Sequence, residues 1–168
     1  MQPVYQLAVL TILPAAVIFA AAFDFFTMTI PNRISLALVA GFVLVVPFSG
    51  LSLADIGWHV AAAALVLAIT FTMFAFGLLG GGDAKLASAV ALWLGWSNLI
   101  DYWILSTLLG GALAIVLLLF RSMPLPFLWA EADWVRRLHD RKGGIPYGLA
   151  LAGAALIVYK DSFWFQSI

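Results

Sequence analysis

A long apolar run in the middle of the chain decides the class of protein. Residues 56–79 have the sequence IGWHVAAAALVLAITFTMFAFGLL, which contains no Asp, Glu, Lys or Arg. About 20 apolar residues in a helix cross a bilayer, because each adds about 1.5 Å along the axis and the hydrocarbon core is about 30 Å thick. This segment therefore predicts a helix that spans a membrane.

The composition of the whole chain extends this prediction. Of its 168 residues, 65% are hydrophobic and only 10% are charged, whereas a soluble protein has roughly 25% charged residues. A chain of this size could not bury so many apolar side chains in one core. Eight Lys and Arg balance eight Asp and Glu, which argues against the basic surface of a nucleic-acid-binding protein. The chain has no cysteine, and this excludes disulfides, thiolate catalysis and cysteine-based metal sites.

Apolar runs separated by polar residues predict an all-α membrane protein with about six transmembrane helices and no separate soluble domain. The predicted spans are residues 4–23, 34–48, 56–79, 84–96, 102–120 and 145–159. The first run is expected to be a retained helix, because residues 1–7 lack the Lys or Arg with which a signal peptide begins. We expect residues 1–168 to form one integral-membrane domain.

The connection 121–144 predicts one further, amphipathic helix on the cytoplasmic surface. Apolar and basic side chains are mixed in it: Phe127, Leu128, Trp134, Val135 and Leu138 among Arg136, Arg137, Arg141 and Lys142. Two interpretations fit this pattern. The helix is either a topological anchor or a docking surface for an anionic headgroup or a partner.

Basic residues predict the orientation of the spans. If the N-terminus is outside, only Lys160 lies outside, and seven cations lie in cytoplasmic loops, as the positive-inside rule requires: Arg33, Lys85, Arg121, Arg136, Arg137, Arg141 and Lys142. Tryptophans prefer the membrane interface, and five of them would lie near the outer one: Trp58, Trp93, Trp96, Trp103 and Trp164. Charge and aromatic residues thus predict the same topology.

Two aspartates at the ends of spans are candidates for chemistry. Asp24 ends the first run among apolar neighbours, and Asp83 follows three glycines. Acids at such positions are costly and suggest a function. At about 4 Å and an effective dielectric near 20, two carboxylates repel by roughly 4 kcal/mol, so one of them would keep its proton. Such a pair can hydrolyse a peptide bond, as in aspartic proteases. A small transporter or channel subunit could equally use the two acids to move protons or cations.

Other polar residues have mainly structural interpretations. Gly80, Gly81 and Gly82 allow close approach of backbone or substrate before Asp83. Lys85 is a topological anchor or holds a substrate carbonyl, and Pro31 shapes the turn after the first span. His59 is expected at the outer interface. With no cluster of histidines and no cysteine, we expect neither a metal nor a cofactor.

Several motifs closely resemble those of the type IV prepilin leader peptidases. They are residues 24–36 (DFFTMTIPNRISL), 80–86 (GGGDAKL), 93–95 (WLG) and 145–148 (IPYG), and they extend over nearly the whole chain. That family consists of integral-membrane aspartyl proteases of the Gly-x-Gly-Asp type. The resemblance implies that Asp24 and Asp83 are the catalytic pair. It also implies that the enzyme cuts the leader from pilin precursors at the cytoplasmic face of the bacterial inner membrane.

Within this family the chain is most similar to the short members. Long members carry an additional cytoplasmic domain with cysteines and are said to methylate the new pilin N-terminus. Here residues 1–23 precede the first aspartate and cysteine is absent, so we do not expect N-methyltransferase activity. The short form resembles the peptidases of tight-adherence (Flp-type) pilus systems and, less closely, archaeal preflagellin peptidases. This implies a Flp-type prepilin as substrate and contact with the pilus assembly machinery.

Overall fold

The computed structural model describes residues 2–126, 129 and 131–166, and within them every regular element is a helix. The helices are α1 (Gln2–Thr27), α2 (Asn32–Val45), the 3-10 turn η1 (Val46–Phe48), α3 (Leu53–Ala75), α4 (Gly81–Leu94), α5 (Leu99–Ser122), α7 (Asp133–His139), α8 (Gly148–Tyr159) and α9 (Phe163–Gln166). This confirms the predicted all-α class. Phe127 and Leu128, assigned above to the amphipathic helix, lie outside the described residues.

Among the described residues, four helical stretches are long and apolar enough to cross a membrane. They are Val4–Thr27, Leu53–Ala75, Leu99–Ser122 and Gly148–Gln166. The apolar stretch Asn32–Phe48 is shorter, and α4 has only 14 residues. The chain is therefore a multi-pass helical membrane protein, but the predicted count of six spans is not confirmed.

Local backbone chemistry explains the ends of the helices next to the site. α3 begins after Ser52, whose side chain and that of Asp55 form a capping box. It ends at Ala75, before the predicted end at residue 79, and Gly77 follows with a φ of +72°. A positive φ is a common way to end a helix and favours glycine. This turn lets the chain reverse into Gly80, the N-cap of α4.

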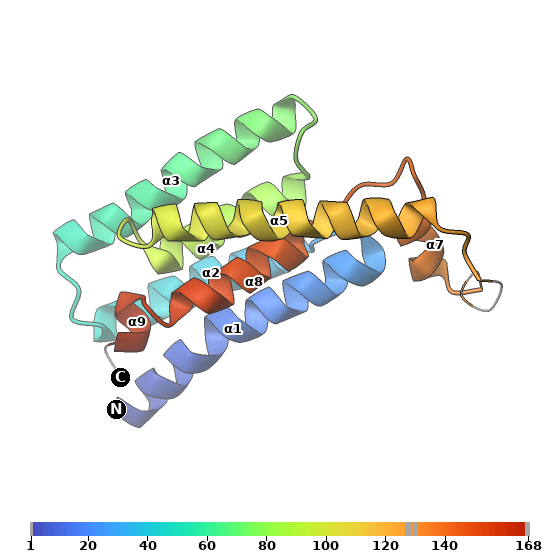
Figure 1. Ribbon diagram of the computed structural model, residues 1–168. Coiled ribbons are helices and arrows are strands. Elements are labelled where there is room, and N and C mark those ends of the chain that lie inside the picture. The colour runs from blue at the N-terminus through green and yellow to red at the C-terminus, as the bar shows by residue number, and fades with distance from the viewer. Residues whose placement is uncertain (1, 127–128, 130, 167–168) are drawn as a thin grey trace.

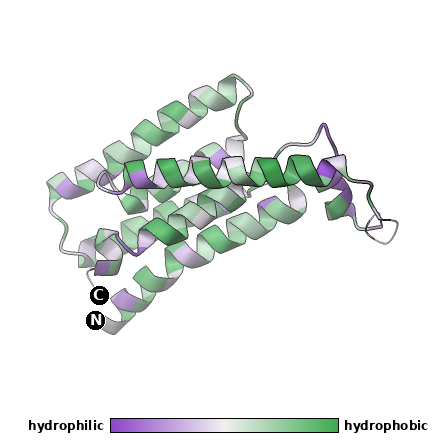
Figure 2. Ribbon diagram, in the orientation of Figure 1, coloured by the Kyte–Doolittle hydropathy of each residue, from purple (hydrophilic) through white to green (hydrophobic). Residues whose placement is uncertain are grey.

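α4 lies at the centre of the bundle and packs against α2, α3 and α8. Figure 1 shows α3 and α1 on opposite sides of the group formed by α2, α4 and α8. Most residues of α4 are buried: Ala84, Leu86, Ala87 and all residues from Ala89 to Leu94. Because other helices surround α4, the length of this helix does not have to match the thickness of the hydrocarbon core. Figure 2 shows hydrophobic residues along the long helices and hydrophilic ones mainly near their ends.

Two of the five tryptophans expected at the membrane interface lie in the protein core instead. The rings of Trp93 and Trp164 are fully buried, and their centroids are 5.2 Å apart. The Nε1–H of Trp93 donates to the carbonyl of Leu38 at 2.8 Å, and that of Trp164 donates to the carbonyl of Trp93 at 2.5 Å. The interface prediction was wrong here because the bundle interior supplies both apolar contacts and an acceptor for each indole. Trp58 and Trp96 remain exposed.

Charge differs between the two ends of the bundle. Arg33 lies in the first turn of α2, Lys85 in the first two turns of α4, and Arg121 in the last turn of α5. Antiparallel packing brings these helix ends together, as the contact between α1 and the start of α8 also shows. Lys160 follows the C-terminal end of α8, at the other end of the bundle. The two aspartates lie at the basic end.

Candidate active site

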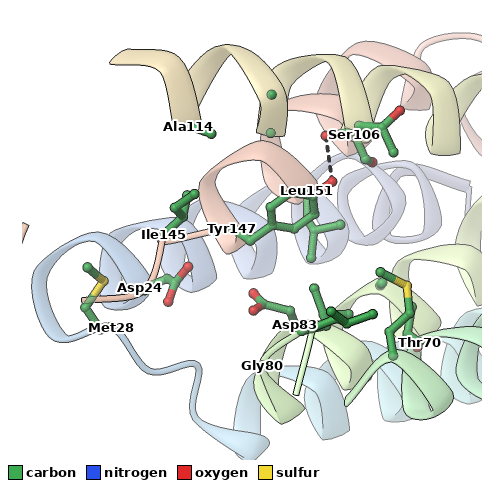
Figure 3. Close-up of a pocket in the computed structure, with 18 of the residues that line it drawn as sticks. Asp24, Met28, Thr70, Gly80, Asp83, Ser106, Ala114, Ile145, Tyr147 and Leu151 are labelled. Atoms are coloured by element: carbon green, nitrogen blue, oxygen red, sulfur yellow. Dashed lines mark hydrogen bonds between the residues drawn. The ribbon is translucent and has the colours of Figure 1, made fainter. Parts of the chain in front are cut away.

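Asp24 and Asp83 come from different helices and line one cavity of about 920 Å³. Asp24 lies near the C-terminal end of α1 and is 5% exposed, and Asp83 lies in the first turn of α4 and is partly buried. Figure 3 shows their carboxyl groups pointing toward one another. Two carboxyl groups that face each other in a partly buried site repel when both are charged, so such a pair shares a proton.

Asp24 is held by the beginning of α8. The backbone N–H of Gly148, the first residue of α8, donates to Oδ2 of Asp24 at 2.7 Å. The first N–H groups of a helix have no partner within the helix and carry partial positive charge, so they bind carboxylates well. A Cβ at position 148 would lie 2.8 Å from Oδ2 of Asp24 and 2.8 Å from Cδ1 of Ile30. Glycine at this position is thus what permits the hydrogen bond.

Asp83 folds back on the N-terminus of its own helix. Its Oδ2 lies 2.7 Å from where a Cβ would be placed on Gly80, so a larger residue there would displace the carboxyl group. Its Oδ1 is buried and has no hydrogen-bond partner in the described part of the chain. Leaving a buried acceptor unsatisfied costs about 1–3 kcal/mol. A proton on this buried oxygen would remove the cost of leaving a charged acceptor unpaired.

Comparison with known proteins identifies the family. Residues 11–115, which include both aspartates, match the type IV leader peptidase family. The chain belongs to this family. It is 32% identical over 148 residues to a prepilin leader peptidase/N-methyltransferase of Aeromonas hydrophila, covering 83% of this chain and 45% of that protein. It is also 32% identical over 155 residues to a protein of the same name from Aeromonas salmonicida (strain A449), covering 86% of this chain and 47% of that protein.

The chain thus spans about half the length of the curated relatives it matches. No solved structure matches it. In this member of the leader peptidase family, Gly148 lies outside residues 11–115, which match the family. Residues 145–148 were recognised as a motif, but the hydrogen bond from Gly148 to Asp24 became apparent only in the folded structure.

The other two glycines before Asp83 serve close packing. A Cβ on Gly81 would lie 3.2 Å from the ring of Phe74 in α3, and a Cβ on Gly82 would lie 3.1 Å from the side chain of Ile30. Of the three glycines, only Gly80 lines the cavity. The start of α4 is thereby pressed against α3 on one side and against the connection between α1 and α2 on the other.

Lys85 and Pro31 lie beside the cavity and do not line it. The Nζ of Lys85 donates to Oδ1 of Asn32 at 2.9 Å, which joins the start of α4 to the start of α2. Pro31 is the N-cap of α2 and has an extended backbone. Both residues therefore support the connection that packs on Gly82.

Sequence reasoning did not assign functions to several residues of the cavity wall. Tyr147 lies next to the two acids in Figure 3, and its O–H donates to the carbonyl of Ser106 in α5 at 3.1 Å. The ring of Tyr147 fits only because residue 110 is glycine, since a Cβ there would lie 2.1 Å from its Cε2. The motif at 145–148 pointed to Tyr147, but nothing in the pattern of residues 105–114 singled out Gly110.

His59 does not lie at the outer interface, where it was expected. His59 is 7% exposed, and its Nδ1 lies 2.8 Å from the carbonyl of Leu92. It is a core residue packed against Phe42 and Trp164, and not an interfacial one. Among the described residues, no three His, Asp or Glu side chains cluster as metal ligands would.

Gly110→Ala is expected to lower the stability of the protein by about 1–3 kcal/mol, because the added methyl group overlaps the ring of Tyr147. The neighbouring Gly111 provides the control, since a Cβ there meets no atom within 4 Å. Thermal unfolding of both variants in the same detergent checks this. Equal melting temperatures would show that Tyr147 does not depend on the space at position 110.

Proposed function

We propose that this protein is a prepilin peptidase, an aspartyl endopeptidase that removes the leader peptide of type IV pilin precursors. The observation that carries the proposal is the pair Asp24 and Asp83, which face each other from α1 and α4 in one cavity. The family supports it, because the matched residues contain both acids. The relatives are named as prepilin leader peptidases.

In the proposed mechanism the two carboxyl groups share one proton and a water molecule lies between them. The charged carboxylate takes a proton from the water, whose oxygen attacks the scissile carbonyl carbon. The protonated partner donates a hydrogen bond and then its proton to the carbonyl oxygen, which gives a tetrahedral intermediate. When the C–N bond breaks, a proton passes to the departing amine. The N–H of Gly148 keeps Oδ2 of Asp24 in place throughout. No cofactor other than water takes part.

The cavity also suggests a route for the substrate. α3 packs mainly on α4, and α5 packs mainly on α8. The cavity is lined by Thr70 and Met73 of α3 and by Ser106, Gly110 and Ala114 of α5. We propose that the apolar helix of the prepilin enters from the bilayer between α3 and α5. Its extended leader junction would then lie at the acids, near the loop of Gly80 and the turn at Pro31.

We further propose a location and a substrate type. The cations at the end of the bundle that holds the acids favour the cytoplasmic side for this end, because of the positive-inside rule. Lys160 lies at the other end. The site would then face the cytoplasm in the inner membrane, with the N-terminus outside. The resemblance to the peptidases of Flp-type pilus systems supports a Flp-type prepilin as substrate, which after cleavage would pass to the pilus assembly machinery.

The test is cleavage of a purified prepilin in proteoliposomes. With a Flp-type prepilin, we expect a product that is shorter by the leader peptide, identified by mass spectrometry. A prepilin of a different pilus type in parallel tests the substrate preference. If the prepilin stays intact while the same proteoliposomes conduct ions, the peptidase proposal is wrong and the transporter hypothesis is favoured.

A further inference from the structure

Arg121 is a buried cation whose guanidinium group donates to three backbone carbonyls. It lies in the last turn of α5, is 6% exposed and lines the cavity of the two acids. Its Nε donates to the carbonyl of Leu138 at 2.7 Å, its Nη1 to that of Gly143 at 3.0 Å and its Nη2 to that of Gly144 at 2.6 Å. In the sequence, Arg121 was one of the seven cations that predict the orientation of the spans.

A buried guanidinium group is well suited to bind several backbone carbonyls at once. Burying a charge is costly unless its donors are satisfied. The planar fork of N–H groups directs its hydrogen bonds in several fixed directions at once. Leu138 lies in the last turn of α7, where the unpaired carbonyls carry partial negative charge and attract cations. Residues 138–144 are thus fastened to the end of α5.

The fastened segment leads directly into the active site. Gly143 and Gly144 line the cavity, followed by Ile145 and Tyr147. The next residue is Gly148, whose N–H holds Asp24. Few residues separate Gly144 from Gly148, so a shift of one is transmitted to the other.

Helix α7, which leads into this segment, is also tied to α1. Nη2 of Arg137 donates to the carbonyl of Phe26 at 2.6 Å. The ring of Trp134 packs against Phe25 and Phe26, with centroids 5.5 and 5.6 Å away. α7 therefore bridges the end of α1, which carries Asp24, and the end of α5, which carries Arg121.

We propose that Arg121 is a positioning residue of the active site. Its three hydrogen bonds hold residues 138–144 at the end of α5, and this sets the N–H of Gly148 on Asp24 and Tyr147 in the cavity wall. The consequence for cleavage rests on the peptidase function proposed above. The effect on the backbone of the segment does not.

The variant that tests the role is Arg121→Lys, which keeps the charge but replaces the fork by a single nitrogen. In prepilin cleavage, kcat is expected to fall about 10- to 100-fold, because a misplacement of about 1 Å can cost a factor of 10². KM should change less than kcat, because the α3 residues on the proposed entry route, Thr70 and Met73, make no hydrogen bond with Arg121. The matched control is Arg136→Lys. Arg136 is exposed on α7 and donates a hydrogen bond to Asp133, which lowers the pKa of that carboxyl group. Its kcat should change by less than about twofold, because exposed pairs contribute little. An unchanged kcat in Arg121→Lys, or an effect on KM alone, contradicts the proposal.

A readout without substrate tests the fastening itself. Trypsin cuts after Arg141 and Lys142, which lie within the fastened segment 138–144. It also cuts after Arg33 and Lys85, which lie elsewhere at the same end of the bundle. In intact Arg121→Lys protein, cleavage at residues 141 and 142 should be about tenfold faster than in the wild type, since local opening becomes easier. Cleavage at residues 33 and 85 should be unchanged. Equal rates at residues 141 and 142, or faster cleavage at all four sites, would overturn the proposal.

The double variant with Gly148→Ala tests whether Arg121 acts through Gly148 or affects cleavage independently of it. In a Gly148→Ala background, Arg121→Lys should cause little additional loss of kcat, because the contact that Arg121 sets is already lost. If the two losses multiply, Arg121 does not act through Gly148. If the wild-type protein cleaves no prepilin, the proposed function fails, whereas the trypsin comparison still decides whether Arg121 holds the segment.

Discussion

Asp83→Asn and Asp24→Asn are each expected to slow prepilin cleavage by a factor of about 10³ or more. Asn keeps the size of the side chain and accepts a hydrogen bond, but it cannot take a proton from water or hold the shared proton. Both carboxyl groups are needed because one activates the water while the other polarises the carbonyl. The measurement is the initial rate of appearance of the mature product in proteoliposomes with equal amounts of each variant.

Asp101→Asn is the control for this prediction. Asp101 is an exposed acid in the first turn of α5 and does not line the cavity of the two acids. Removing its charge should leave the cleavage rate unchanged. Normal processing by either Asp24→Asn or Asp83→Asn would eliminate that residue from the catalytic pair.

Gly148→Ala is expected to reduce cleavage by a factor of about 10² or more, because small misplacements of a catalytic group are that costly. The added Cβ would lie 2.8 Å from both Oδ2 of Asp24 and Cδ1 of Ile30. Either the carboxyl group turns away or α8 moves back, and in both cases the hydrogen bond from the N–H of Gly148 is lost. The overpacking should also destabilise the fold by about 1–3 kcal/mol.

Gly57→Ala is the matched control, because Gly57 also lies near the start of a helix and a Cβ there meets no atom within 4 Å. Size-exclusion elution and thermal unfolding of both variants separate loss of fold from loss of active-site geometry. A Gly148→Ala protein that is folded and cleaves at the wild-type rate would show that Asp24 does not need this contact.

The class of fold was predictable because the bilayer imposes a simple length rule on apolar helices. Residues 56–79 and the long run before Arg121 needed no neighbours to be recognised as helices. The rule does not decide whether α4 spans the bilayer, because its 14 residues pack against α2, α3 and α8. A helix buried in protein does not have to match the hydrocarbon thickness, and apolar composition does not distinguish protein from lipid as its surroundings.

The same limit explains the tryptophans. Trp93 and Trp96 are three residues apart at the end of one apolar run, yet Trp93 is fully buried and Trp96 is exposed. The difference depends on the Leu38 carbonyl and on Trp164, which come from distant parts of the chain. The interfacial preference of tryptophan is an average over such environments.

Composition and motifs were enough to predict a helical membrane protein and to single out Asp24 and Asp83, because acids near a bilayer are costly however the helices pack. The folded arrangement of the helices was needed to see that the two carboxyl groups line one cavity, that the N–H of Gly148 donates to one of them, and that Arg121 binds the segment before Gly148. The reason is physical. Helix formation and membrane insertion depend on the local composition of the chain, whereas a backbone N–H becomes a ligand only when packing brings it to a carboxylate, and no residue type reveals that in advance.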